Sequence, residues 1–200
     1  MMPRASGPSP ATIHPTLERM FDTRRIKHCR VCGAPTQYRV PADDNRDRAV
    51  CSACGEVHYE NPLNVVGTVP VWGEQVLLCR RNIEPRYGLW TLPAGFMELG
   101  ETTAEGALRE TVEEAGARIE LQELFTLLNV VRVGQVHLFY RARLLDTHFD
   151  PGPETIEAQL FHEAEIPWEQ LAFRTVRETL QRYFSDRRSG RFQLHLADIG

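Results

Sequence analysis

The stretch Gly95-Phe-Met-Glu-Leu-Gly-Glu101, continued by Arg109-Glu-Thr-Val-Glu-Glu-Ala-Gly116, decides the fold of this chain and points to its chemistry. Five residues separate Gly95 from Glu101, and seven more separate Glu101 from Arg109. Three further glutamates follow Arg109 within five positions, and a glycine ends the run. Carboxylates gathered at these spacings favour a site for a divalent cation, because hard cations prefer oxygen ligands.

A helix is expected to start directly after the loop that follows Gly95. Thr102 can serve as the N-cap, and Glu105 three residues later completes a capping box. At 3.6 residues per turn, Glu110, Glu113 and Glu114 fall on one arc of that helix. The opposite arc is apolar and is predicted to pack on the core through Ala104, Ala107, Leu108, Val112 and Ala115.

The glutamate arc has two interpretations. Glu110 and Glu114 lie at i,i+4, where like charges repel, and a bound Mg²⁺ or Mn²⁺ would remove this repulsion. The alternative is a solvated acidic face that binds nothing. The glycine and the arginine at fixed spacings favour the metal site, because a solvated face does not require them.

These positions resemble the Nudix hydrolases, whose box reads G-x5-E-x7-R-E-U-x-E-E-x-G-U, where U is a bulky apolar residue. Every glycine and charged position of the box is present. Thr111 and Ala117 occupy the two U positions, so the packing of the helix departs from the family pattern. The resemblance implies an α/β fold, a Nudix α/β/α sandwich with a mixed sheet, and a pyrophosphohydrolase that acts on acid anhydrides.

The resemblance also implies which groups hold the catalytic metal. Glu110 and Glu114 are expected to bind Mg²⁺ or Mn²⁺ directly, with Glu113 nearby or bridging through water. The preceding segment reads as a strand that runs into a tight loop. A backbone carbonyl of Ala94 or Gly95 in that loop is expected to complete the protein's share of the ligands.

Further catalytic candidates lie around this centre. Arg109 is expected to pair with Glu101 or Glu113 and so to hold the helix carboxylates in place. Glu157 precedes the end of a predicted strand, where Nudix chains often carry an acidic residue that helps the metal site or acts as base. A plain surface glutamate is the alternative for Glu157.

The substrate-binding candidates are Arg81, Arg86 and Phe96. The arginines could contact pyrophosphate oxygens, with ordinary exposed side chains as the alternative. An adenine would need an aromatic or apolar wall, for which Phe96 and three further aromatic residues are available, although each is also a plausible core residue. These three are Trp72, Trp90 and Phe139.

Four cysteines define a second, smaller site. Cys29 and Cys32 form one C-x2-C-G turn, and Cys51 and Cys54 form another eighteen residues later. This spacing predicts a zinc ribbon whose four thiolates leave no open position for a catalytic water, so the zinc should be structural. Disulfides are the alternative, which the absence of a visible secretory signal disfavours. A fifth cysteine, Cys79, is expected to be a buried strand residue.

Composition sets the frame for the whole chain. Two hundred residues with 42% hydrophobic content can form one ordinary domain with a small appendage. Apolar runs are too short for a membrane helix, so no membrane association is expected, and a cytoplasmic setting is the simplest. The net charge of −4 and the near-neutral ribbon disfavour nucleic acid as a partner.

The chain is therefore predicted to divide into four parts. Residues 1–19 should be disordered, residues 20–61 should form the ribbon, residues 62–186 the Nudix domain, and residues 187–200 a C-terminal tail. Residues 64–72 and 75–81 read as a hairpin, and further strands are expected at 119–131, 135–145 and 155–161. A closing helix is expected at 173–184.

The predicted function is metal-dependent hydrolysis of the pyrophosphate bond in a nucleoside diphosphate derivative. The ribbon placed before the box resembles a branch that includes ADP-ribose and FAD pyrophosphatases, so ADP-ribose or FAD is expected as substrate, with AMP released. NADH, NAD or dinucleoside polyphosphates are alternatives, as is a non-catalytic sensor whose ribbon binds a partner. Many enzymes of this kind are dimeric, so a homodimer is expected.

Overall fold

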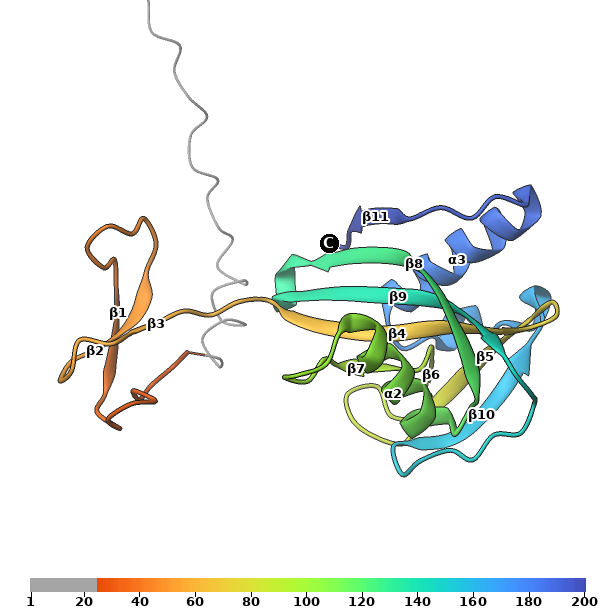
Figure 1. Ribbon diagram of the computed structural model, residues 1–200, viewed down its shortest axis with the longest axis horizontal. Coiled ribbons are helices and arrows are strands. Elements are labelled where there is room, and N and C mark those ends of the chain that lie inside the picture. Colours follow the sequence, from red (N-terminus) through yellow and green to blue (C-terminus); the bar gives the residue numbers. More distant parts are fainter. Residues whose placement is uncertain (1–24) are drawn as a thin grey trace, which may run out of the picture. The chain divides into compact units, whose positions relative to one another are not determined.

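The computed structural model describes residues 25–200, and the expectation of disorder for residues 1–19 lies outside this range. The described residues belong to two compact units that divide between Asn61 and Pro62 (Figure 1). Each unit has its own sheet. No helix within the described range is long and apolar enough to cross a bilayer.

The first unit is a three-stranded antiparallel sheet in the order β1-β2-β3. Two similar turns carry its cysteines: the N–H of Gly33 donates to the carbonyl of Cys29, and that of Gly55 to the carbonyl of Cys51. Both glycines have positive φ, at 76° and 78°, which residues with a Cβ rarely adopt. The strands are β1 (Thr36–Arg39), β2 (Arg48–Cys51) and β3 (Val57–His58).

The second unit is built on an eight-stranded mixed sheet. Its main path runs β10-β5-β4-β9-β8-β11, with β6 paired to β5 and β7 paired to β4. The pairs β4–β9 and β8–β11 are parallel and the others antiparallel, which confirms the mixed sheet. The strands are β4 (Leu63–Trp72), β5 (Gln75–Arg81), β6 (Trp90–Thr91), β7 (Ala94–Phe96), β8 (Ile119–Val130), β9 (Gln135–Leu144), β10 (Thr155–Phe161) and β11 (His195–Asp198).

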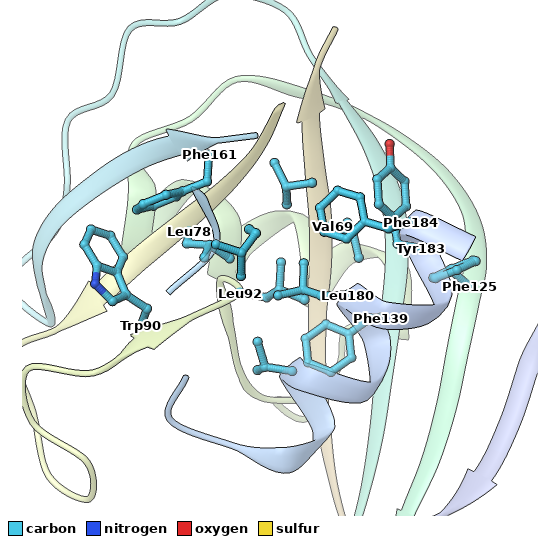
Figure 2. Packing of buried hydrophobic residues seen from close by; sticks show 13 residues of the cluster. Val69, Leu78, Trp90, Leu92, Phe125, Phe139, Phe161, Leu180, Tyr183 and Phe184 are labelled. Atoms are coloured by element: carbon cyan, nitrogen blue, oxygen red, sulfur yellow. The ribbon is translucent and has the colours of Figure 1, made fainter. Parts of the chain in front are cut away.

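Two helices cover opposite faces of this sheet, which confirms the α/β/α sandwich (Figure 1). Helix α2 (Thr103–Ala115) packs Ala107 against Val66 of β4. Helix α3 (Arg174–Ser189) packs Leu180 into the larger core with Val69, three residues further along the same strand. Figure 2 shows this larger core, in which aromatic side chains from strands meet the helix.

Helix α2 begins as predicted, and its buried face agrees only in part with the predicted one. Thr102 is the N-cap and forms the capping box with Glu105. Leu108 and Val112, which were predicted to pack on the core, are 40% and 50% exposed. The residues that the helix buries include Ala107 and Ala115, as predicted, together with Gly106, Glu110, Thr111 and Glu114.

Close approach of α2 to the sheet explains why the buried face of the helix differs from the predicted one. A Cβ on Gly106 would lie 2.8 Å from Cγ2 of Val66, so only a glycine allows the helix to come this near. The carboxylates on that side are then covered by the sheet and the loop before the helix. Hydrophobic periodicity was therefore right for Ala107 and Ala115 and wrong for Leu108 and Val112.

The remaining elements follow the predicted pattern up to residue 184. The hairpin, the strand pair joined by the 3-10 turn Val131–Val133, and the strand Thr155–Phe161 are all present. Two further 3-10 turns lie at Glu163–Glu165 and Trp168–Gln170.

The C-terminal end is more ordered than a tail. Helix α3 continues to Ser189, and β11 pairs in parallel with β8 at the edge of the sheet. A buried contact between Nε2 of His195 and Oδ2 of Asp186, at 2.8 Å, ties the strand to the helix. Four residues with one clear apolar position give a weak strand signal, so this strand depends on its tertiary contacts.

Candidate active site

Strand β7 and helix α2 meet at the backbone of Ala94 and Gly95. The N–H of Ala94 donates to Oε2 of Glu114 at 2.8 Å. A methyl group on Gly95 would overlap the carboxylate of Glu110, so this carboxylate lies directly against the backbone. Gly95 pairs with Val66 of β4, which places it in a short strand where a tight loop was expected.

Arg109 joins the other acidic residues of the site. Its guanidinium binds Glu101 with two hydrogen bonds, at 2.8 and 3.0 Å, and contacts Glu110 at 2.7 Å and Glu113 at 3.1 Å. It also donates to the carbonyl of Phe96 at 3.2 Å. Hydrogen bonding to Arg109 lowers the pKa of Glu101 to about 2. The arginine thus fixes the loop to the helix by charge-assisted hydrogen bonds.

The helix carboxylates differ in their surroundings. Glu110 and Glu114 are buried, and burial raises the pKa of both, to about 8 for Glu114. Glu113 is exposed, apart from its contact with Arg109. Two buried carboxylates on adjacent turns repel when both are ionised.

These carboxylates suit a divalent cation that shares its ligands with other groups. A bound cation would favour the ionised forms of Glu110 and Glu114, which burial otherwise disfavours. Their oxygens do not lie close enough together to bind a metal ion without other ligands. Among the described residues, only the four ribbon cysteines form such a close group of ligand atoms. Mg²⁺ usually retains waters and binds substrate phosphates beside one or two carboxylates, so the donor set fits it.

Glu154, just before β10, acts electrostatically on the helix carboxylates and was not among the residues selected from the sequence. Burial is the main cause of the raised pKa of Glu110 and Glu114, and the negative charge of Glu154 adds to it in both. Asn82 holds this segment, because its N–H donates to the carbonyl of Glu154 and its side chain to the carbonyl of Pro153, both at 2.8 Å. The strand pattern of the sequence could not indicate this effect of Glu154 on the helix carboxylates, because Glu154 lies before β10.

The structure does not bring Glu157 to these carboxylates. Glu157 pairs with Arg80 at 3.1 Å, and both side chains are partly exposed. Arg80 follows Val76 and Leu78 on the face of β5 that packs toward α3, opposite to α2. Glu157 therefore lies on the other side of the sheet from the metal candidates.

The substrate-binding candidates lie in different environments. Arg81 is buried, donates to the carbonyl of Pro85 at 3.0 Å and stacks on Phe173, while its positive charge acts on Glu114. Arg86 is exposed in the loop after β5 and has a positive φ of 71°. Phe96 is half exposed, next to the backbone that meets Glu110.

The other aromatic candidates are either buried in the core or located at the far end of β4. Trp90 and Phe139 are buried in the larger core (Figure 2). Trp72 ends β4 at the hairpin turn, whereas β7 pairs with the opposite end of that strand, from Val65 to Gly67. Phe96 is thus the one aromatic residue of the four that remains available beside the candidate metal site.

The four ribbon cysteines form the tight cluster that their spacing predicts. Their sulfur atoms lie within 4.8 Å of one another, and three pairs are separated by 3.4, 3.5 and 3.7 Å. Zinc bound to four thiolates at 2.3 Å would separate them by about 3.8 Å, so the geometry fits zinc without disulfides. The N–H groups of Ala53 and Cys54 point to Sγ of Cys51 and lower the pKa of that thiol.

Cys79 lies apart from this cluster, in β5. It is 1% exposed, and burial raises the pKa of its thiol. This confirms the prediction of a buried strand residue.

Comparison with known protein families agrees with both sites. A family model described as "NUDIX domain" matches residues 62–186, which is more than half of the chain, and one described as "Nudix N-terminal", a zinc ribbon, matches residues 27–60. The chain belongs to the Nudix family. Its Nudix domain is preceded in the sequence by an N-terminal four-cysteine zinc ribbon.

Individual Nudix relatives differ in how much of the chain they match. The crystal structure of a NUDIX hydrolase from Nitrosomonas europaea is 46% identical, with a TM-score of 0.84, and covers 87% of this chain and 99% of its own. An "NAD-capped RNA hydrolase NudC" from Stutzerimonas stutzeri is 29% identical over 145 residues, 70% of this chain and 50% of its own. A mitochondrial NAD(P)H pyrophosphatase of Mus musculus is 34% identical over 92 residues, 46% of this chain and 25% of its own. This chain spans half or less of the length of these two curated relatives.

The zinc ribbon gives a first prediction. Cys32→Ser should abolish binding of about one zinc per chain and lower the thermal stability of residues 29–60, because metal binding and folding are coupled in such sites. Metal analysis and hydrogen exchange would measure both. Cys79→Ala is the matched control and should keep its zinc. Purified protein that holds no zinc and carries oxidised ribbon thiols would contradict the assignment.

The raised pKa of Glu114 in the Nudix helix gives a second prediction. The folded protein holds a proton on this group up to about pH 8, whereas the unfolded chain loses it near pH 4.5. Without Mg²⁺ or Mn²⁺, stability should therefore fall as pH rises through this interval, by a few kcal/mol. Glu114→Gln should lack this fall. Thermal melts of both proteins from about pH 5 to about pH 9 would test this, and parallel curves would contradict it.

Proposed function

We propose that this Nudix protein hydrolyses the pyrophosphate bond of an adenosine diphosphate derivative and depends on Mg²⁺ or Mn²⁺. The observation that carries the proposal is the burial of Glu110 and Glu114 against the backbone of Ala94 and Gly95. Such an arrangement is unfavourable for an empty acidic surface and favourable for a cation site. A non-catalytic sensor is disfavoured, because every charged position of the box is retained.

The residues of the site have different roles in the proposed reaction. Glu110 and Glu114 would hold the cation, with Glu113 bridged through water and a carbonyl of Ala94 or Gly95 beside them. When bound, the cation polarises phosphate oxygens and lowers the pKa of a water molecule. Arg109 keeps Glu110 in position through the contact described above.

Hydrolysis itself requires one bond to form and one to break. The oxygen of a water molecule attacks one phosphorus, the bond from that phosphorus to the bridging oxygen breaks, and the water gives up a proton. We propose the carboxylate of Glu154 as the acceptor of this proton, because its negative charge acts on both Glu110 and Glu114. We further propose that Arg81, whose positive charge acts on Glu114, helps to neutralise the leaving phosphate.

Two substrate classes are supported by different observations. ADP-ribose and FAD are supported by the resemblance to the branch with a ribbon before the box, with Phe96 and Arg86 offering exposed contacts for the nucleotide. NADH and NAD are supported by the names of the curated relatives. All four molecules contain adenosine diphosphate, so AMP is the product expected in common. We further propose a homodimer, in which a second subunit would complete the substrate site.

A substrate panel tests the proposed function. With Mg²⁺ or Mn²⁺, kcat/KM for ADP-ribose or FAD should be at least about tenfold higher than for any nucleoside triphosphate. The panel should include NADH, NAD and an NAD-capped oligonucleotide, with products identified by chromatography. Glu114→Gln should lower kcat by about 10²-fold or more, as loss of a group that stabilises transition-state charge does. Preference for a triphosphate, or full activity of Glu114→Gln, would contradict the proposal.

Glu154 and Glu157 provide a matched pair for the next prediction. Glu154→Gln should lower kcat by about 10²-fold and remove the basic requirement from the acid limb of the pH–rate profile. Glu157→Gln should retain kcat within about threefold, because an exposed ion pair with Arg80 contributes little. Steady-state kinetics across pH would measure both. The reverse order of effects would return the catalytic role to Glu157.

A further inference from the structure

Thr68 of β4 and Thr111 of α2 form a buried pair of hydroxyl groups. Both residues are fully buried, and their Oγ1 atoms lie 2.7 Å apart. The Thr111 hydroxyl donates to the carbonyl of Ala107 at 2.7 Å. Its only proton is therefore used within the helix, and the Thr68 hydroxyl donates to Thr111.

Thr68 also holds the loop on the other side of the candidate metal site. Its backbone N–H donates to the carbonyl of Pro93 at 3.1 Å. The preceding residue, Gly67, pairs with Ala94, and a side chain on Gly67 would overlap Ala94 and the Pro93 carbonyl. One residue of β4 thus contacts both the loop before β7 and the helix that carries the carboxylates.

The position of Thr111 in the box makes this contact specific to the chain. The Nudix pattern asks for a bulky apolar residue there, and apolar packing is non-directional, so it tolerates small shifts along a helix axis. A hydrogen bond between two buried hydroxyls requires a defined distance and angle. It therefore restrains both the axial position and the rotation of α2 on β4.

We propose that Thr68 is a positioning residue that sets the separation between the carboxylates of α2 and the backbone of Ala94 and Gly95. The pair Thr68–Thr111 restrains the helix, and the N–H of Thr68 restrains the loop. Glu110 directly precedes Thr111 in the restrained helix, Glu114 lies about one turn after it, and the Ala94 N–H donates to Glu114. The inference rests on the proposed function, since it assigns these groups to one cation site.

A cycle of valine variants tests this proposal, because valine has the shape of threonine without the hydroxyl. Thr68→Val and Thr111→Val should each lower the melting temperature, since Thr111→Val leaves the Thr68 hydroxyl unpaired in the core and Thr68→Val removes the hydrogen bond to Thr111. The double variant places two apolar groups together and should recover most of the lost stability. Its affinity for Mn²⁺, measured by electron paramagnetic resonance, should stay about tenfold below that of the unchanged protein.

A second hydroxyl pair in the same unit serves as the matched control. Thr126 of β8 and Thr179 of α3 are also fully buried, with their Oγ1 atoms 3.1 Å apart, but they tie the other helix to the sheet. The double variant Thr126→Val/Thr179→Val should match the first double variant in stability and keep the Mn²⁺ affinity unchanged. Thr68→Ser, which keeps the hydroxyl, should restore Mn²⁺ affinity.

Three outcomes would overturn the proposal. The first is recovery of both stability and Mn²⁺ affinity in Thr68→Val/Thr111→Val, which would make the pair a packing contact only. The second is an equal loss of affinity in the control pair, which would indicate a general loosening of the unit. The third is an unchanged protein that binds no Mn²⁺ at the α2 carboxylates. Mn²⁺ binding needs no turnover, so a protein that binds Mn²⁺ but hydrolyses nothing in the substrate panel would contradict the proposed function alone.

Discussion

The burial of two carboxylates between a helix and the backbone of a loop is the constraint on which this structure depends. Glu110 and Glu114 can lie there only because the backbone that meets them carries small residues. Gly106 lets the helix approach the sheet, and Gly95 leaves space for the Glu110 carboxylate. Arg109 then supplies the positive charge that keeps the surrounding acidic residues together. Removing any one of these features would separate the helix from the loop.

The same arrangement lowers the stability of the fold, because it buries acidic groups where other helices bury apolar ones. Most helices of this kind bury apolar side chains, whereas α2 turns Leu108 and Val112 to solvent and covers acidic and hydroxyl groups instead. Burial of ionisable groups opposes folding unless they are neutral or paired. The protein compensates with the apolar core around α3, where aromatic rings and aliphatic side chains pack on the other face of the sheet. The larger core thus lies on one side of the sheet, while the other side has smaller apolar clusters and the candidate metal ligands.

Local signals in the sequence predicted local structure well. The capping box at Thr102 and Glu105 and the two C-x2-C-G turns of the ribbon all depend on residues near one another in the chain. Periodicity placed the glutamates on one arc of α2 but assigned Leu108 and Val112 to the core, because it cannot register an approach of the helix that depends on a glycine. Glu154 escaped notice for a similar reason, since its position is set by Asn82, seventy-two residues earlier in the sequence. The strand β11 depends on a contact with Asp186 that no local pattern reveals.

The position of β11 has a practical consequence for the boundaries of the catalytic unit. The family match ends at residue 186, which is inside α3 and ahead of the strand that pairs with β8. A shortened protein that stops there would lose the glycine that ends the helix, the partner of Asp186 and the outermost strand of the sheet. The ring of Phe125, which packs against Phe192 and His195, would become accessible to water. For expression and crystallisation, a shortened protein should therefore include β11 (His195–Asp198) rather than stop where the family match ends.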